Sequence, residues 1–297
     1  MEPVPFRSGF VAIVGRPNVG KSTLVNRLVG QKVAITSDKP QTTRHAIHGV
    51  VTTDDAQVVF VDTPGIHKPH HLLGEAIVKA ATDVLADVDV RVFVVDAQEV
   101  AGKGDAFISD LLAGAAKPTV LVLNKVDRVQ RVPEAVFASY RALGAFVEVV
   151  PVSARTGRNM KALLAAITER LPVGPRYYEG DVPTDQTLRT LAGELIREQI
   201  LRQTSEEIPH SVAVRVDTFD EGASPVRIAA TIFVERDSQK GIVIGEAGSR
   251  LKAIGQAARA QIEAQLDGPV FLELWVKVLK NWRRDRLQLK RLGYVVD

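Results

Sequence analysis

Short apolar runs alternate with helix-like segments along the first 170 residues. The runs lie at 10–14, 46–51, 57–61, 89–96, 118–124 and 146–151. Several are nearly continuous in valine and isoleucine, as in strands that are buried on both faces. Segments with helical periodicity lie between them, near 21–30, 72–86, 104–114, 133–143 and 158–170. This alternation predicts a doubly wound α/β domain with a mostly parallel sheet over residues 1–171.

The pattern changes after a stretch rich in proline and glycine, and we predict a linker at 172–186. A helix over about 187–203 follows, then two alternating strands, a short helix, a Gly-x-x-Gly turn, a long amphipathic helix and a strand at 270–278. The order α-β-β-α-α-β predicts a smaller α+β domain over residues 187–297, which ends in a basic helical tail.

Composition and charge narrow the classes of function. The chain of 297 residues has no cysteine, which excludes disulfides and thiolate metal sites. No signal peptide is recognisable, and no stretch approaches the roughly 20 apolar residues of a membrane helix. Residues 239–297 carry 11 Lys/Arg against 6 Asp/Glu, whereas residues 181–238 carry 6 against 11. This C-terminal excess of positive charge favours an anionic partner.

Residues 15–22 read Gly-Arg-Pro-Asn-Val-Gly-Lys-Ser, between a predicted strand and a predicted helix. This is the phosphate-binding pattern G-x-x-x-x-G-K-[ST], whose glycines let backbone N–H groups point at phosphates. Lys21 is expected to hold the β- and γ-phosphates, and the Ser22 hydroxyl to bind Mg²⁺. The remaining nucleotide contacts expected here are Gly15, Asn18, Val19 and Gly20 within the stretch and Thr23 directly after it.

Two further segments complete the expected phosphate and magnesium site. Asp62-Thr63-Pro64-Gly65 follows a buried strand, so Asp62 can orient Mg²⁺ and the Gly65 N–H can reach the γ-phosphate. A polar segment at 40–44 lies between the first helix and the second strand and contains two threonines. Thr43 is the expected magnesium ligand and Thr42 the alternative, because the sequence does not fix the register.

The base is predicted by Asn124-Lys125-Val126-Asp127, which follows another buried strand. The Asp127 carboxylate can accept from both N1–H and the 2-amino group of guanine, whereas adenine offers neither donor. The Lys125 stem can lie on the base. Ser153 and Ala154 follow the next strand, and the Ala154 N–H is expected to reach guanine O6. The ligand is therefore predicted to be GTP or GDP rather than ATP.

These motifs together resemble those of the Ras-like translation-factor GTPases, and the form Gly-Arg-Pro-Asn-Val-Gly-Lys-Ser with Gln-Thr-Thr-Arg is similar to the Era group. The α-β-β-α-α-β half resembles a type II KH domain, in which a Gly-x-x-Gly loop approaches single-stranded RNA. The resemblance implies a GTP-hydrolysing switch that binds near the 3′ end of 16S ribosomal RNA and assists assembly of the small (30S) ribosomal subunit.

The expected RNA contacts follow from the Gly-x-x-Gly loop and the basic C-terminal end. They are Gly245, Glu246, Ala247, Gly248, Arg250, Lys252, Lys277, Lys280, Arg283 and Arg284. Glu246 would repel phosphate, and Arg250 and Lys252 can compensate. Trp275 and Trp282 are candidates for stacking on bases.

Hydrolysis depends on two positions besides Lys21, Thr43 and Gly65. Ile66 follows Gly65, where Ras-type switches carry a water-positioning glutamine, so slow intrinsic turnover is expected. Asn18 resembles an asparagine that, in related GTPases, helps to hold K⁺ beside the phosphates. The alternative is that Asn18 only shapes the loop.

Two other functions stay open at this stage. One is a GTPase that acts in tRNA modification or at the membrane surface, and the other is a non-catalytic RNA-binding scaffold that holds GTP structurally. A cytoplasmic monomer is expected, with peripheral association at the inner face of the cell membrane as an open alternative. His67, His70 and His71 have no carboxylate at ligand spacing, so no metal site is predicted there.

Overall fold

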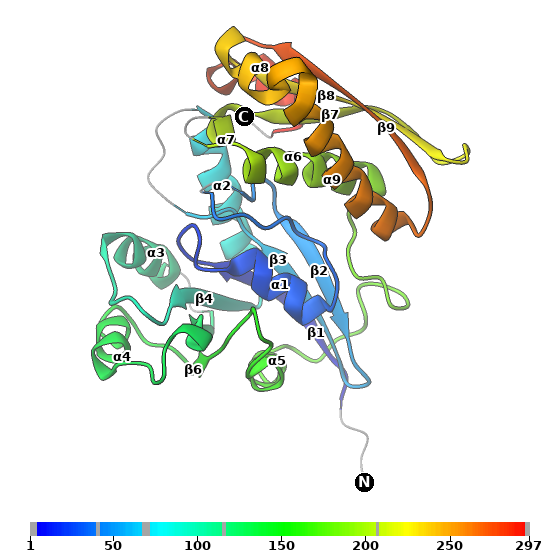
Figure 1. The fold of residues 1–297 in the computed structure, drawn as a ribbon. Helices are drawn as coiled ribbons and strands as arrows, with labels where there is room; N and C mark the ends of the chain where they lie inside the picture. The colour runs from blue at the N-terminus through cyan, green and yellow to red at the C-terminus, as the bar shows by residue number, and fades with distance from the viewer. Residues whose placement is uncertain (1–4, 40–41, 67–71, 115–116, 206–207, 295–297) are drawn as a thin grey trace. The chain divides into compact units, whose positions relative to one another are not determined.

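The computed structural model describes residues 5–39, 42–66, 72–114, 117–205 and 208–294, which form two compact units (Figure 1). Of the described residues, the first unit contains 5–34, 43–66 and 77–185 except 115–116. The second contains 35–39, Thr42, 72–76, 186–205 and 208–294. Most of the second unit is therefore the C-terminal part of the chain, but a short segment that follows the first helix and residues 72–76 also belong to it.

The first unit is built on a mostly parallel sheet with the strand order β2-β3-β1-β4-β5-β6. Its described strands are β1 (Arg7–Val14), β2 (Ile47–Thr52), β3 (Ala56–Asp62), β4 (Val90–Asp96), β5 (Thr119–Asn124) and β6 (Glu148–Pro151). Only the β2–β3 pair among them is antiparallel. The doubly wound fold expected from the alternation is confirmed.

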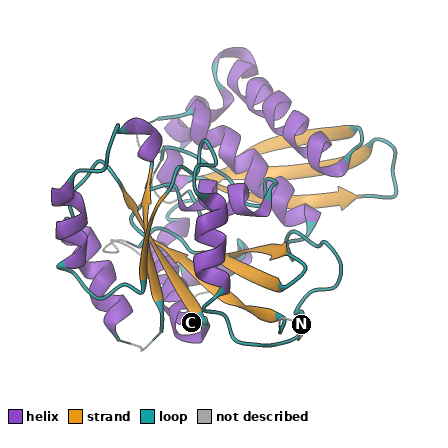
Figure 2. Ribbon diagram, turned by 90° about the horizontal axis from the view of Figure 1, so that it is seen from below, coloured by secondary structure: helices purple, strands orange, loops and turns teal. Residues whose placement is uncertain are grey.

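Helices cover both faces of this sheet (Figure 2). They are α1 (Lys21–Val29), α2 (Leu72–Asp87), α3 (Lys103–Ala113), α4 (Glu134–Arg141) and α5 (Met160–Thr168). Val11 and Ile13 of β1 pack in one core with α1 and α5, whereas Ala12 and Val14 pack in another with α2, α3 and α4. Burial on both faces explains why the strands are continuously apolar in sequence.

The segment expected to be a linker packs on the first unit. Pro183 accepts a hydrogen bond from the Val50 N–H at the β2 edge at 2.9 Å, and Asp185 contacts the His48 ring at 2.6 Å. The Gln57 side chain also bonds the backbone at Tyr177 and Tyr178. Residues 172–185 therefore continue the first unit rather than run free of it.

The second unit has the expected order α-β-β-α-α-β. Its elements are α6 (Leu188–Gln203), α7 (Ile208–Ser211), β7 (Ala213–Asp220), β8 (Val226–Val234), α8 (Asp237–Ile244), the 3₁₀ turn η2 (Glu246–Gly248), α9 (Ser249–Leu266), β9 (Val270–Val278), the 3₁₀ turn η3 (Trp282–Arg284) and α10 (Arg286–Arg291). The strand order is β7-β8-β9, with β7 antiparallel and β9 parallel to β8. Residues of α6, α9 and one face of the sheet form its core, including Ile196, Ile232 and Ile254.

The segment Ile35–Thr42 is anchored to α6 within the second unit. Ile35 is fully buried in the core of that unit. The buried Glu198 carboxylate accepts hydrogen bonds from the Thr36 N–H at 2.8 Å and the Thr36 hydroxyl at 3.3 Å. Arg197, also buried, donates to the carbonyl oxygen of Thr42. The sequence pattern gave no sign that this segment packs with the C-terminal elements.

Candidate functional site

The phosphate-binding loop at 15–22 needs glycine at two positions for steric reasons. A Cβ atom at Gly15 would lie 2.3 Å from the Val94 carbonyl oxygen, and one at Gly20 would lie 2.4 Å from Asn124 Nδ2. Gly20 also has φ of +98°, a conformation that side chains other than glycine rarely adopt. The loop therefore packs closely on β4 and on the end of β5, and its chain turns directly into α1.

Lys21 begins α1 and folds back over the loop. Its ammonium donates to the carbonyl oxygens of Gly15 at 3.0 Å and Arg16 at 3.1 Å, and the side chain is 6% exposed. Burial lowers the pKa of the Lys21 ammonium to about 8, although the charge of Asp62 opposes this shift. A buried ammonium with backbone partners only is well placed to exchange them for phosphate oxygens.

The expected magnesium ligands meet at the carboxyl end of β3. The Ser22 and Thr43 hydroxyls lie 2.9 Å apart, and the Thr43 hydroxyl donates to Asp62 Oδ2 at 3.3 Å. Burial raises the pKa of the Asp62 carboxyl to about 6, against the opposing effects of Lys21 and of hydrogen bonds from the two hydroxyls. Among the described residues Asp62 Oδ1 has no hydrogen-bond partner. Two hydroxyls beside a partly unpaired carboxylate form an oxygen donor set that fits Mg²⁺.

The structure distinguishes the two candidate threonines. Thr43 is 5% exposed and lies at the donor set, whereas the Thr42 hydroxyl donates to the Lys39 carbonyl at 2.6 Å. This geometry favours Thr43. Gly65 lies against the phosphate-binding loop, since a Cβ atom there would be 3.0 Å from Pro17 Cγ. Ile66 is buried in the core of the first unit, and its side chain carries no polar group that could orient a water.

The residues expected at the base also lie together. The Ser153 hydroxyl donates to Asp127 Oδ1 at 2.6 Å and lowers the pKa of the Asp127 carboxyl. Lys125 has φ of +68° and its ammonium pairs with Asp96 Oδ2 at 2.7 Å. That pairing holds the Lys125 ammonium at the end of β4. Asp96, at the end of β4, was not expected from the sequence, because a single aspartate after a strand is uninformative.

Asn124 joins the phosphate side of the site to the base side. Its side-chain amide donates to the Val19 carbonyl at 2.8 Å, and its Oδ1 accepts from the Ala154 N–H at 3.0 Å. A second link to the phosphate-binding loop is likewise not marked by any sequence motif. Arg16 pairs with Asp105 at 2.9 Å and with Glu99 at 2.6 Å, which fixes the phosphate-binding loop to the start of α3.

The Gly-x-x-Gly turn joins α8 to α9. Gly245 has φ of +74° and Gly248 φ of +79°, and a Cβ atom at Gly245 would lie 2.8 Å from Arg250 Cβ. Ala247 also adopts a left-handed conformation, with φ of +48°. Glu246 and Ala247 are exposed, so the backbone of this turn is accessible to a ligand.

A groove of about 450 Å³ lies beside the turn, between α9 and β9. Leu251, Leu272 and Leu274 line it with apolar surface, and Lys252 and Arg259 add positive charge. Gly255 keeps the helix close to the strand, because a Cβ atom there would lie 3.4 Å from Leu274 Cδ1. An apolar floor with basic groups at the rim suits a strand that presents bases inward and phosphates outward.

One candidate for stacking on bases is placed differently from the prediction, and two of the expected RNA contacts have partners within the protein. Trp282 is completely buried, donates from Nε1 to the Ser211 carbonyl at 3.1 Å and stacks on Tyr294, so the expectation that it stacks on bases is wrong. Arg283 pairs with Glu235, and Arg250 donates to the Ile242 carbonyl. A sequence pattern cannot show these pairings, because it does not reveal which charges find partners.

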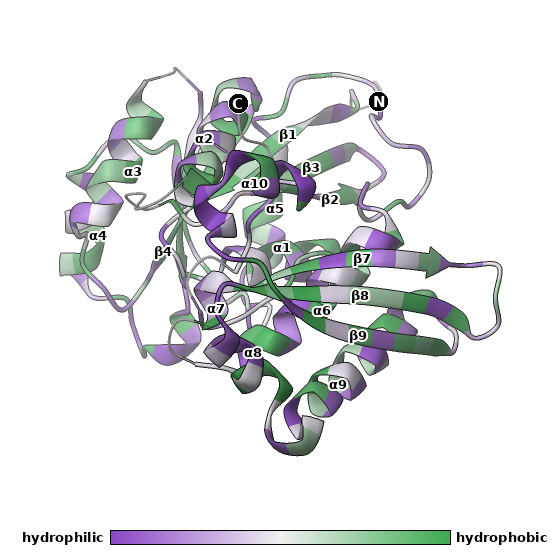
Figure 3. Ribbon diagram, turned by 90° about the horizontal axis from the view of Figure 1, so that it is seen from above, coloured by the Kyte–Doolittle hydropathy of each residue, from purple (hydrophilic) through white to green (hydrophobic). Residues whose placement is uncertain are grey.

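The other basic candidates at this end of the chain are open to solvent. Lys252, Lys277, Lys280 and Arg284 are exposed, and Trp275 is 58% exposed on β9. Figure 3 marks most of α10 as hydrophilic. The histidines at 67, 70 and 71 lie outside the described residues. Within the described ranges, no group of three or more His, Cys, Asp or Glu could hold a metal ion, and no helix is long and apolar enough to cross a membrane.

Comparison with known proteins gives a match for the domain that carries the nucleotide site and a second match for the domain that carries the Gly-x-x-Gly turn. Residues 10–125 match the family model for 50S ribosome-binding GTPases, and residues 207–283 match that for KH domains. The chain is 52% identical over 297 residues to the GTPase Era of Nostoc sp. strain PCC 7120. The match covers 99% of this chain and 92% of that protein.

Two solved structures are similar over nearly the whole chain. An Aquifex aeolicus Era variant bound to GDP·AlF4⁻ is 40% identical, with a TM-score of 0.94 over 98% of this chain and 100% of that one. Era in complex with MgGDPNP and nucleotides 1506–1542 of 16S ribosomal RNA is 39% identical, with a TM-score of 0.93 over the same shares.

Proposed function

The chain belongs to the Era family of GTPases, and we propose that it hydrolyses GTP at the site around Lys21 and binds the 3′ region of 16S ribosomal RNA through its KH domain. We further propose that it thereby assists assembly of the 30S subunit. The convergence of Lys21, Ser22, Thr43 and Asp62 at one end of the sheet is the observation that supports the catalytic part most directly.

Each group has a distinct task in this proposal. Lys21 and the loop N–H groups hold the phosphates, and Ser22, Thr43 and Asp62 would hold Mg²⁺, which neutralises charge on the β- and γ-phosphates when bound. The Gly65 N–H would contact the γ-phosphate. Asp127 would accept from guanine, with Ser153 keeping its carboxylate oriented.

Water placement is the weak part of the intrinsic reaction. Ile66 is 2% exposed and offers no polar group, so we expect unassisted turnover on the order of 10⁻³ to 10⁻² s⁻¹. Asn18 lies exposed in the loop with φ of +65°, a position from which its side chain could help to hold K⁺ beside the phosphates. Such an ion would supply the positive charge that an arginine finger supplies elsewhere.

Turnover in two salts tests this proposal. Replacing K⁺ by Na⁺ should slow GTP hydrolysis, and Asn18→Ala should remove the difference between the salts. Equal rates for the unsubstituted protein in both salts would leave Asn18 with only a loop-shaping role. No measurable turnover in either salt would instead favour the non-catalytic scaffold.

The groove between α9 and β9 supports RNA as the second ligand. Filter binding to an RNA of nucleotides 1506–1542, with a scrambled RNA as control, tests the sequence preference. Equal affinity for the two RNAs would count against the 3′ end of 16S RNA as the target. The match to a KH domain weighs against the tRNA-modification and membrane alternatives. We also propose that the protein acts in the cytoplasm as a monomer, with any membrane association peripheral.

A further inference from the structure

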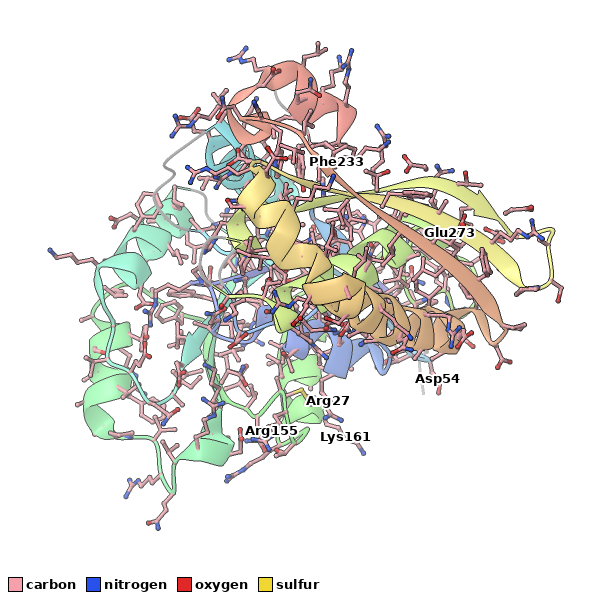
Figure 4. The ribbon with its side chains drawn as sticks, turned by 45° about the horizontal axis from the view of Figure 1, so that its top comes forward. Arg27, Asp54, Arg155, Lys161, Phe233 and Glu273 are labelled. Atoms are coloured by element: carbon pink, nitrogen blue, oxygen red, sulfur yellow. The ribbon has the colours of Figure 1, made fainter. Side chains whose placement is uncertain are left out.

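Arg27 of α1 reaches the loop that follows β6. Its Nε donates to the Ala154 carbonyl at 3.1 Å, and its Nη2 donates to the Arg155 carbonyl at 2.5 Å (Figure 4). The bonded residues lie 127 and 128 positions apart in the chain. Arg27 belongs to none of the nucleotide-binding motifs, and nothing in the sequence marks it.

These two bonds complete a chain of hydrogen bonds that links the phosphate-binding loop, the end of β5, the loop after β6 and α1. The Val19 carbonyl of the phosphate-binding loop is bonded to the Asn124 side chain, which in turn accepts from the Ala154 N–H. Ala154 is bonded through its carbonyl to Arg27, and Arg27 lies on the helix that begins in the same phosphate-binding loop. The base loop is thus held from both sides, by β5 and by α1.

We propose that Arg27 is a positioning residue for guanine recognition, which fixes residues 154–155 at the O6 side of the base, so that a backbone N–H group of this loop can donate to O6 when the nucleotide binds. This inference rests on the proposed function, in which the site binds guanine nucleotides, and on the expectation from the sequence that the loop after β6 contacts O6. An arginine suits the task because its planar guanidinium can donate to two successive carbonyls at once, whereas a lysine ammonium cannot match that geometry. A loop held in place before the ligand binds loses less entropy on binding.

The action of Arg27 should be confined to the O6 side of the base. Ser153, which orients Asp127, is held by bonds that do not involve Arg27. The Ser153 hydroxyl accepts from the Thr156 N–H at 3.1 Å, and its carbonyl accepts from the Gly157 N–H at 2.8 Å. Recognition of the 2-amino group by Asp127 should therefore survive the loss of Arg27.

Nucleotide analogues separate these two sides. GDP, 6-thio-GDP and IDP share the ribose and phosphates. In 6-thio-GDP a sulfur, which accepts hydrogen bonds weakly, replaces O6, and IDP lacks only the 2-amino group. We would measure the Kd of each for the full chain, for Arg27→Ala and Arg27→Lys, and for Lys161→Ala. Lys161 lies exposed on α5, the helix beside α1, and its loss removes a neighbouring positive charge without removing a bond to the loop.

Arg27→Ala should weaken GDP binding about tenfold, because two charge-assisted bonds are lost. Its preference for GDP over 6-thio-GDP should shrink toward one, while its preference for GDP over IDP stays at the value of the unsubstituted protein. The Kd values and their ratios for Arg27→Lys should lie between those of Arg27→Ala and the unsubstituted protein. Lys161→Ala should leave all three Kd values unchanged. If Arg27→Ala does not fold, as judged by circular dichroism, Arg27→Lys provides the same comparison of ratios.

Three results would overturn the proposal. They are an unchanged Kd for GDP in the Arg27 variants, an equal loss of affinity for all three nucleotides, and an equal loss of affinity in Lys161→Ala. The first excludes a role in binding, and the other two show a general effect on charge or stability. A different failure, equal affinity of the unsubstituted protein for GDP, IDP and ADP, would instead sink the proposed function itself.

Discussion

At the scale of single residues, the choice of base depends on the Asp127 carboxylate, which is exposed and can accept hydrogen bonds from a nucleotide. Asp127 is bonded to Ser153 through one oxygen, and this bond keeps its pKa low, so the group is ionised at neutral pH. An ionised carboxylate accepts and cannot donate, which matches the two donors on the Watson–Crick edge of guanine.

Asp127→Asn should therefore change the base that is bound. The amide oxygen can keep the bond from Ser153, while the amide N–H₂ meets a donor on guanine but an acceptor, the C2 oxygen, on xanthine. GTP affinity should fall by a factor of roughly 10³–10⁴ and affinity for xanthosine triphosphate should rise. Competition binding with both nucleotides checks this, and retention of tight GTP binding would refute the assignment of Asp127.

A second residue-scale prediction concerns pH. Because burial raises the pKa of Asp62 to about 6, its carboxylate is protonated below that pH in the nucleotide-free protein. Ionisation of a group with a raised pKa costs stability as pH rises from about 4 toward 6. The magnesium site, by contrast, needs the ionised form and is lost as pH falls through about 6.

The affinity of the GDP-bound protein for Mg²⁺ should thus fall about tenfold for each pH unit below 6. Magnesium titrations between pH 5 and 8 would measure this, with the affinity of free GDP for Mg²⁺ at each pH as the correction. An affinity that stays constant down to pH 5 after that correction would show that Asp62 keeps an ordinary pKa or does not bind the ion.

At the scale of elements, the turn between α8 and α9 lets RNA approach its backbone closely but carries a negative charge that repels phosphate. Its glycines and the left-handed Ala247 expose the backbone, but Glu246 adds a negative charge where a phosphate is expected. Aspartate and asparagine tolerate a left-handed conformation better than alanine. Substitution of Ala247 by either residue therefore leaves the turn intact and isolates the effect of charge.

Ala247→Asp should weaken binding of the 1506–1542 RNA about tenfold through repulsion between the added carboxylate and phosphate. Ala247→Asn, of nearly equal size, should bind within about twofold of the unsubstituted protein, and GTP affinity should not change in either variant. Filter binding measures both. If the aspartate variant binds RNA normally, the turn does not contact the phosphates.

A second element, α6, holds the segment that runs into Thr43. Glu198 is fully buried and accepts from both the N–H and the hydroxyl of Thr36. Glu198→Gln removes the charge that strengthens these bonds. Amide hydrogen exchange at Thr36 should become about tenfold faster, whereas Arg202→Ala, at a half-exposed side chain that also contacts Thr36, should have a smaller effect. Unchanged exchange in Glu198→Gln would contradict this anchoring.

At the scale of the whole molecule, charge is distributed unevenly along the chain. The last 59 residues carry the basic excess that follows an acidic stretch, and RNA affinity with this origin depends on salt. The structure separates the basic residues into two kinds. Arg284 is exposed, whereas Arg283 is 23% exposed and is paired with Glu235.

Neighbouring arginines should therefore give different results. Arg284→Ala should reduce the slope of log affinity against log salt by up to about 0.7, the value for one phosphate contact on a single strand. Arg283→Ala should leave the slope nearly unchanged and lower the free energy of unfolding by about 1–2 kcal/mol, because it removes the partner of Glu235. A salt titration and a urea titration measure these quantities. The same change of slope in both variants would show that the ion pair does not hold Arg283.

The sequence by itself determined the features that are local in the chain. Apolar runs predict buried strands, and glycines at 15 and 20 predict a tight loop. Short motifs at strand ends predict which residues form the nucleotide site, because parallel strands end at the same edge of a sheet. The nucleotide, the two folds and most of the phosphate and base residues follow from such short-range patterns.

Only the tertiary structure decided which distant groups meet. It brings Thr43 rather than Thr42 to Asp62, buries Trp282 under Tyr294, and bonds Arg27 to a loop 127 residues away. Such contacts depend on the packing of whole elements, and the same residue types occur along the chain without them. A side chain's partners, and hence its charge state and role, are fixed by distances in the folded chain that sequence spacing does not encode.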